Sequence, residues 1–439
     1  NQLQKIEITD FSDILQINIE SKIFRPTLFD FLANNSLQFY KTTETSITSP
    51  AYKFIIDDAS FLGDVKTFSE LKIISKDSLS LQLNALKIYQ KIITFHLKEN
   101  NKNALAEIDI QRLNFVNQLA TFNDSENILL SSLLTSKEQF KNHEASALYA
   151  FEIANSYRNK ANSSSTENTK DRFKNKEAIA ICDEVINQFP KSFGAEKCIL
   201  LKAQIEEKTL SIIAEEYIPI HHTSRLLVTY NNVEKLFFTA YKINQNKLEF
   251  FNKLHKLEDK KTFISRQEKV ANWQHQLRNE HDYLQHTTEV LVPKFENGMY
   301  LILASESEEL QENSIYGTAQ IQVTNLTLIE NNFDDHYQYQ IVNRNTGNPI
   351  KKAEIHITNP NRTNSGFINQ YLTTDKNGFA TFKNKYTYVD CDITVKTKND
   401  FAYFGSHYFY KNDLGKLFIL KQLHLKNKAI NLTFLQTNL

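Results

Sequence analysis

The sequence predicts a multidomain protein of the α plus all-β class, in which an irregular array of helical hairpins precedes two β-sandwiches. Apolar residues recur at helical spacing in the first half, and short β-rich runs bounded by turn residues follow. With 439 residues, the chain is long enough for several separate cores. The expected domains are 1–216 (helical), 217–312 (a β-sandwich with a helical insertion at 247–287), 313–411 (a second β-sandwich) and 412–439 (the start of a further strand region).

The helical region is predicted to begin its periodic part with two amphipathic helices. A polar break at 100–103 separates them, so they are expected to pack as an antiparallel hairpin. The residues expected on one face of each helix are Leu79, Leu83, Leu86, Ile93 and Leu97 for the first, and Ala104, Ile108, Phe115, Leu119 and Phe122 for the second.

Three further helices are predicted between 147 and 205. Their apolar stripes are Ala147, Phe151, Ala154 and Tyr157, then Ile179, Cys182, Ile186 and Phe189, then Cys198, Leu201 and Ile205. The segment 178–190 resembles the second helix of a tetratricopeptide repeat (TPR), because small residues allow close helix packing and Pro190 stops the helix. No strict repeat period is present, so the prediction is a TPR-like but irregular array.

The first sandwich is predicted from the change of pattern near Tyr217. The β-rich runs 226–230 and 236–243 flank Asn231-Asn232, which indicates a hairpin. Helical spacing then predicts the insertion, and β character returns at 289–293 and 298–304. The residues that predict a helix within the insertion are Val270, Trp273, Leu277 and Leu284.

The second sandwich is predicted from pairs of apolar residues two positions apart, which lie on one face of a strand. The turn sequences 345–349 and 374–378 separate these strands and contain Gly, Asn, Asp and Pro. The pairs are Ile321/Val323, Tyr339/Ile341, Ile355/Ile357 and Ile393/Val395.

The net charge argues against a dedicated nucleic-acid surface, and the hydropathy predicts no membrane span. Lys plus Arg and Asp plus Glu each number 51, so no net positive charge favours nucleic acid. No apolar run approaches the roughly 20 residues that cross a bilayer. The chain begins at Asn1 without a signal-peptide apolar core, so we expect a trimmed or expressed piece of a longer polypeptide.

The three cysteines form no metal-binding or redox motif. Cys182 and Cys198 flank a predicted turn at 189–191 and could face each other. The favoured interpretation is that both are small, buried apolar residues, and the disulfide state of this pair stays open.

No catalytic, cofactor-binding or metal site is predicted. Adjacent His221 and His222 would point to opposite faces of a strand, which is poor geometry for one metal. The hydrolase, P-loop and dinucleotide motifs do not occur. The other candidates weighed are His275, His281 and His286 with Glu280 and Asp282 on the inserted helix, a calcium loop at 331–336, and the aromatic cluster Phe401, Tyr403, Phe404, Tyr408, Phe409 and Tyr410. Solvent exposure is the favoured interpretation of His221 and His222, and a metal site is disfavoured for the group around His275. A strand-to-strand loop is favoured at 331–336, and core or interdomain packing is favoured for the aromatic cluster.

The β-rich segments carry a family resemblance. Residues 323–328, 339–355 and 373–382 resemble a macroglobulin domain of bacterial α2-macroglobulin-like proteins, and 398–403 fits the next strand. Residues 296–303 resemble a preceding macroglobulin domain. The stretch 25–32 and the helix expected around Trp273 resemble a subgroup with an N-terminal helical region.

The resemblance implies two immunoglobulin-like macroglobulin sandwiches in the non-catalytic N-terminal part of a protease-trapping peptidase inhibitor. It also implies proteases as partners, and a periplasmic or cell-surface location with a lipid anchor on a preceding segment. The family thioester is built from Cys-Gly-Glu-Gln, whereas Asp392-Ile393-Thr394 follow Cys391, so no thioester is expected here. The alternative function is a cell-envelope adaptor whose helical array binds a protein partner, with the sandwiches as spacers.

Overall fold

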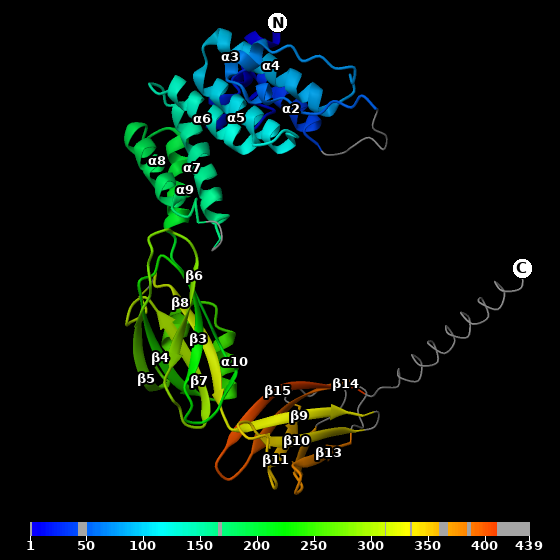
Figure 1. The fold of residues 1–439 in the computed structure, drawn as a ribbon, viewed down its shortest axis with the longest axis vertical. Coiled ribbons are helices and arrows are strands. Elements are labelled where there is room, and N and C mark those ends of the chain that lie inside the picture. Colours follow the sequence, from blue (N-terminus) through cyan, green and yellow to red (C-terminus); the bar gives the residue numbers. More distant parts are fainter. Residues whose placement is uncertain are drawn as a thin grey trace, which may run out of the picture. The chain divides into compact units, whose positions relative to one another are not determined.

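The computed structural model describes residues 2–42, 51–165, 169–311, 313–333, 336–359, 368–383 and 388–410. The chain divides into two compact units. Unit 1 contains Asn1–Glu207 and Glu280–Leu284, and unit 2 contains Lys208–Asn279 and Gln285–Leu439. The helices α1–α9 belong to unit 1 and the strands to unit 2, which confirms an α plus β multidomain chain (Figure 1). The expected strand region at 412–439 lies outside the described residues.

Unit 1 is helical throughout its described elements. These are the 3-10 helices η1 (Gln2–Lys5), η2 (Ile8–Phe11) and η3 (Ala59–Leu62), and the α-helices α1 (Ile19–Phe24), α2 (Leu28–Tyr40), α3 (Val65–Glu70), α4 (Leu81–Glu99), α5 (Lys102–Leu119), α6 (Ser125–Gln139), α7 (Ser146–Asn162), α8 (Lys174–Gln188) and α9 (Phe193–Glu206).

The predicted pair of helices at 79–122 corresponds to α4 and α5. Ser80 caps α4 by accepting from the N–H of Leu83, and Asn100 ends it in the left-handed conformation. Leu83, like Leu86 and Ile93, is fully buried, as predicted. Leu79 is wrongly placed in the prediction, because α4 begins after the Ser80 cap and Leu79 is 87% exposed.

The core around α5 contains a buried charged group. Arg112 pairs with Asp109 one turn earlier, and it donates to the carbonyl oxygens of Phe61 at 2.6 Å and Gly63 at 2.8 Å. The hydroxyl of Tyr149 on α7 donates to Asp109 at 2.9 Å. Every side chain in the group has partners, which is the condition for burying an ion pair. The group ties η3, α5 and α7 together.

The helices α7, α8 and α9 form a second core of small side chains. Ala147, Ala154, Cys182 and Cys198 are fully buried in it. A methyl group at Gly194 would lie 2.4 Å from the carbonyl carbon of Ala147, so α9 and α7 approach closely there. The helical region ends with α9 at Glu206, earlier than the expected boundary at 216.

Unit 2 begins with two sheets that enclose one core. The strands are β1 (Thr209–Ala214), β2 (Tyr217–Ile218), β3 (Ser224–Asn231), β4 (Lys235–Ile243), β5 (Glu268–Gln276), β6 (His286–Val292), β7 (Gly298–Ser305) and β8 (Tyr316–Val323). One sheet has the order β1-β3-β6 and the other β2-β8-β7-β4-β5. Their facing apolar residues, such as Val228 and Phe238, share a single core, and we call this part the first sandwich.

Two predictions about the first sandwich are wrong. The runs around Asn231-Asn232 do not form a hairpin, because β3 and β4 belong to different sheets. Asn232 adopts a left-handed φ of 54°, and Val233 enters the core as the chain crosses between the sheets.

The prediction of a helical insertion at 247–287 is also wrong for the second half of this range. Only α10 (Gln245–Asn252) and α11 (Leu257–Ile264) are helical, and α10 lies beside β7 (Figure 1). The region around Trp273 is strand β5, and its indole stacks on Phe238 of β4 at 5.1 Å. Residues three and four apart suggested a helix, but pairing of the alternating residues with β4 determines the structure.

The second sandwich consists of β9 (Leu326–Asn332), β10 (Tyr337–Asn343), β11 (Glu354–Thr358), β12 (Asn369–Thr373), β13 (Phe379–Phe382), β14 (Tyr388–Lys396) and β15 (Phe401–Tyr410). The sheet orders are β13-β10-β9 and β12-β11-β14-β15. The predicted inward pairs Tyr339/Ile341, Ile355/Ile357 and Ile393/Val395 are all fully buried.

The predicted domain boundary at 312/313 needs correction. Strand β8 pairs with β7 and β2, so the first sandwich continues to Val323. The turn at 374–378 forms, with Gly378 at a φ of 75° and Asp375 accepting from the N–H of Phe379. It connects strands of different sheets, β12 and β13, and therefore closes no hairpin.

Candidate functional site

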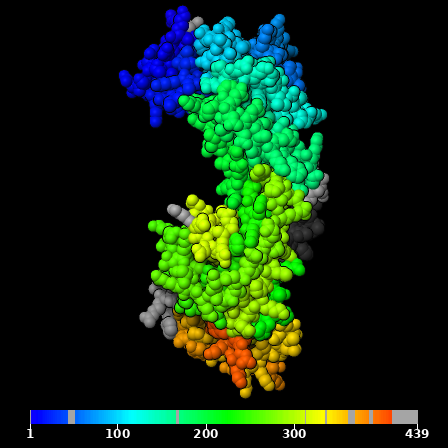
Figure 2. All heavy atoms as spheres, turned by 90° about the vertical axis from the view of Figure 1, so that its left-hand side faces the viewer, coloured from blue at the N-terminus to red at the C-terminus, as the bar shows by residue number. Residues whose placement is uncertain are grey.

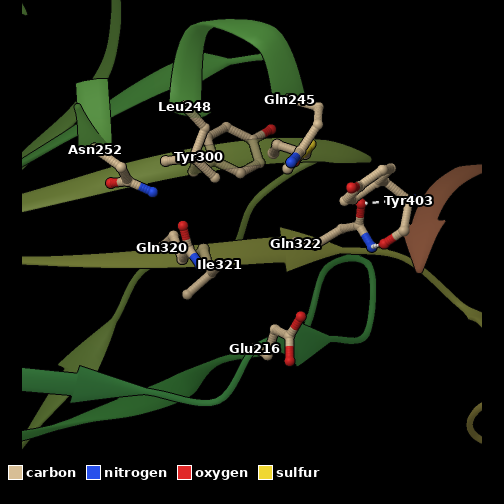
Figure 3. A pocket seen from close by; sticks show the side chains of 10 residues that line it. Glu216, Gln245, Leu248, Asn252, Tyr300, Gln320, Ile321, Gln322 and Tyr403 are labelled. Atoms are coloured by element: carbon tan, nitrogen blue, oxygen red, sulfur yellow. Dashed lines mark hydrogen bonds between the residues drawn. The ribbon is translucent and has the colours of Figure 1, made fainter. Parts of the chain in front are cut away.

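A polar pocket of about 120 Å³ lies within unit 2 where α10, β8 and β15 meet (Figure 3). Four of its ten lining side chains are amides, and one is a carboxylate. The lining residues are Glu216, Gln245, Leu248, Asn252, Met299, Tyr300, Gln320, Ile321, Gln322 and Tyr403.

The alternation of β8 places the amides on the pocket side. Ile321 and Val323 point into the core of the first sandwich, so Gln320 and Gln322 point to the other face. Gln320 is exposed, whereas Gln322 is 4% exposed and held by β15. A strand with one apolar face therefore provides both the packing and the site.

Two side-chain amides hold the free edge of β15. Gln322 donates to the carbonyl oxygen of Tyr403 at 2.8 Å and accepts from its N–H at 2.8 Å (Figure 3). Asn297 does the same for Phe401, at 3.1 Å in both directions. Because Phe401 and Tyr403 are two residues apart, both present their backbone groups on the same edge. The amides thus take the place of a neighbouring strand.

Asp400 lies directly before β15, and its carboxylate accepts hydrogen bonds from residues at the end of the first sandwich. Its carboxylate accepts from the Thr324 hydroxyl and the Asn297 amide at 2.7 Å each, and from the N–H of Asn325 at 2.8 Å. Burial raises the pKa of Asp400, although the donated hydrogen bonds and the charge of Arg344 oppose the shift. The three contacts offset part of the cost of burying this carboxyl group.

Aromatic packing completes the contact between the sandwiches. Tyr217 of β2 stacks on Phe404 of β15 at 5.6 Å, and the Arg344 guanidinium lies 5.2 Å from the Tyr217 ring. Burial lowers the pKa of Arg344 and raises that of Tyr217. On the face in Figure 2, the green to yellow atoms of the first sandwich meet the orange and red atoms of the second.

Tyr403 makes a further hydrogen bond beside the pocket. The Tyr403 hydroxyl donates to Asp392 at 3.0 Å, and burial together with the carboxylate charge raises the pKa of Tyr403. The tyrosine is therefore neutral at physiological pH. The pocket lining contains no histidine, serine or cysteine to serve as a base or nucleophile.

The histidines weighed as metal ligands do not share an element. His221 lies in a turn with a left-handed φ of 61°, at 3.5 Å from Glu296, rather than at the start of a strand. His275 is on β5, His281 is in a loop and His286 is on β6, so the helix expected to carry them does not exist. Across the described ranges, no group of three or more His, Cys, Asp or Glu is arranged to hold a metal ion.

The other candidates are distributed through the fold. Asp334 and Asp335 of the calcium-loop candidate lie outside the described residues. The residues of the aromatic cluster differ in exposure. Phe409 is fully buried, whereas Phe401 and Tyr408 are 42% and 55% exposed. The three cysteines are buried and form no disulfide in this structure; they are Cys182, Cys198 and Cys391.

Sequence reasoning missed the residues that form this site. Asn297 and Asp400 lie within the segments 296–303 and 398–403, and Gln322 lies between Ile321 and Val323, but a polar side chain in such a segment resembles any solvent-facing residue. The only signal is the position of Gln322 between the two core residues Ile321 and Val323, and it does not identify the partner strand.

No protein-family model matches the chain, and no curated relative does. Solved structures similar to it include native α2-macroglobulin from Escherichia coli spanning domains NIE-MG1, with 10% identity, a TM-score of 0.31, and coverage of 44% of this chain and 95% of that chain. A longer form spanning MG0-NIE-MG1 has 10% identity, a TM-score of 0.32 and coverage of 44% and 63%. The D0-D1 domain of intimin has 10% identity, a TM-score of 0.22 and coverage of 46% and 100%.

Within the described part of the chain, no helix has both the length and the apolar character needed to cross a membrane.

Proposed function

We propose that this chain is a non-catalytic scaffold segment of an α2-macroglobulin-like protein that traps proteases. In this proposal the helical region is TPR-like, and the two sandwiches are immunoglobulin-like macroglobulin domains. Proteases are the partners of the intact protein, and its location is the periplasm or the cell surface.

The observation that carries the proposal is the contact between the two sandwiches. Backbone edges, amides and Asp400 are all used to join one sandwich to the next. Such an arrangement suits a structural chain of joined domains rather than a catalytic domain. The resemblance of 339–355 and 373–382 to macroglobulin sequence supports the same function.

The experiment is a trapping assay on the intact gene product. After incubation with an endoprotease, a trap leaves cleavage of a small chromogenic peptide intact and blocks cleavage of a large protein substrate. Equal inhibition of both substrates, or inhibition of neither, would contradict trapping. A catalytically inactive protease variant is the control, because a trap triggered by cleavage should not retain it.

A partner-binding adaptor is the second candidate, and the exposed apolar residues of α9 favour it. Ile199 and Leu200 are 49% and 64% exposed on this helix. If the adaptor is correct, one partner co-purifies with the full chain without any protease, and Leu200→Glu abolishes the capture. Under the trapping proposal, capture depends on active protease and Leu200→Glu has no effect.

A further inference from the structure

The helices α8 and α9 bring two cysteine thiols together inside unit 1. Cys182 and Cys198 are each fully buried and belong to the same core. Cys182 lies eight residues before Pro190 in the turn and Cys198 lies eight residues after it, so the two residues face each other across the α8–α9 hairpin. The side chain of each is the leading influence on the pKa of the other, which agrees with this placement.

The hairpin itself determines this proximity. Helix α8 ends with the N–H of Phe189 bonded to the carbonyl of Val185, and Ser192 caps α9 by accepting from the N–H of Ala195. Ala178 and Ala195 are fully buried in the same core, and their small side chains allow close packing around the thiols. No third element is needed to align the pair.

The pairing is also exclusive. The third cysteine, Cys391, lies on β14 in the core of the second sandwich, which belongs to unit 2. Complete burial keeps Cys182 and Cys198 from a thiol of another molecule once the protein has folded. Their one available partner in the folded state is each other.

We propose that Cys182 and Cys198 are a disulfide-forming pair that oxidises while the α8–α9 hairpin forms. One S–S bond replaces two S–H bonds, and the two electrons and two protons pass to a disulfide oxidant, such as glutathione disulfide or the disulfide of a thiol oxidase. The oxidant is reduced to two thiols. Bond formation requires the sulfurs to approach to about 2.05 Å.

The timing follows from burial. Both thiols are fully buried, so a disulfide oxidant cannot reach either sulfur in the folded state, although the contact between them lowers the pKa of Cys182 while it raises that of Cys198. Exchange is therefore fast only before the core closes. A protein folded under reducing conditions should keep both thiols even when an oxidant is added later.

The test counts thiols in the full chain after refolding with reduced and oxidised glutathione or with reductant alone. Alkylation in denaturant followed by intact mass measurement should find one modified cysteine after oxidative refolding, mapped to Cys391, and three after reductive refolding. The oxidised form should melt higher by roughly 5–10 °C, because the cross-link restricts the unfolded chain.

The controls separate the pair from adventitious oxidation. Cys391→Ser should leave the cross-link intact, whereas Cys198→Ala should leave Cys182 alkylated under both conditions. Three alkylated thiols after oxidative refolding of the wild-type chain, or a glutathione adduct on Cys182, would overturn the proposal. Because that result comes from the unmodified protein, it remains decisive even if Cys198→Ala does not fold.

Discussion

The side-chain amide of Gln322 forms two hydrogen bonds with the backbone of Tyr403, one as donor and one as acceptor, each 2.8 Å long. Gln322 belongs to β8 of the first sandwich and Tyr403 to the edge strand β15 of the second. An amide is the side chain that reproduces the donor and acceptor of a peptide group. The contact therefore continues the β15 edge across a domain boundary.

Replacing Gln322 should weaken the joint between the sandwiches. We expect Gln322→Ala to lower the free energy of unfolding of unit 2 by about 1–3 kcal/mol, because both backbone groups of Tyr403 lose their partner. Hydrogen exchange at the Tyr403 amide should accelerate. Gln320→Ala, at the exposed neighbour on the same face of β8, is the matched control and should change neither quantity. Equal effects of the two variants would contradict the role of Gln322.

Removal of the Asp400 carboxylate should cost more than its neutralisation. Asp400→Ala leaves the Thr324 hydroxyl, the Asn297 amide and the Asn325 N–H without this acceptor, and we expect a loss of about 2–4 kcal/mol. Asp400→Asn keeps one acceptor oxygen and should lose less. Urea unfolding of the two variants gives the comparison, and an equal loss would show that the acceptor contacts are unimportant.

His407 should make the second sandwich less stable as the pH rises. Burial by itself lowers the pKa of His407, but the 2.9 Å contact with Glu330 and the Phe404 carbonyl outweigh it, so the pKa lies above 6.5. A raised folded pKa stabilises the protein fully below the ordinary value of about 6.5, and this contribution disappears as the pH rises through the folded pKa.

The measurement is the urea midpoint between about pH 5.5 and about pH 8.5. We expect His407→Gln to remove the part of the pH dependence that the wild type shows above about pH 6.5, with a loss of about 1 kcal/mol at the acidic end. Parallel profiles for the two proteins would show that the imidazole carries no such dependence.

Gly194 should tolerate no side chain. In Gly194→Ala the new methyl group would lie 2.4 Å from the carbonyl carbon of Ala147, and separating α7 from α9 should cost about 2–4 kcal/mol. Gly347→Ala is the control, since its Cβ would meet nothing within 4 Å and only its φ of 70° opposes the change, at about 1 kcal/mol. Thermal unfolding of the full chain should rank the two variants in that order.

The sequence by itself determined that a helical region precedes a β-rich region, and it identified many of the buried residues. The stripe from Leu83 to Ile93 lies in the core, and so do the alternating pairs of β10, β11 and β14. These patterns are local, because the spacing of apolar residues follows from the period of one helix or one strand. The turn glycine Gly378 was visible for the same reason, since a left-handed turn favours a residue without a side chain.

Only the tertiary structure decided which strands pair and to which domain each strand belongs. Strand β8 reads like any other strand, yet its hydrogen bonds to β7 and β2 assign it to the first sandwich. Trp273 lies in a strand because β5 pairs with the edge of β4. Gln322 binds the backbone of Tyr403 because β15 passes beside it. Such pairings join residues far apart in the chain, whereas hydrophobic periodicity reports only the face of one element. The sequence thus specified many of the elements and their buried faces, whereas long-range hydrogen bonding determined the domain boundary and the site.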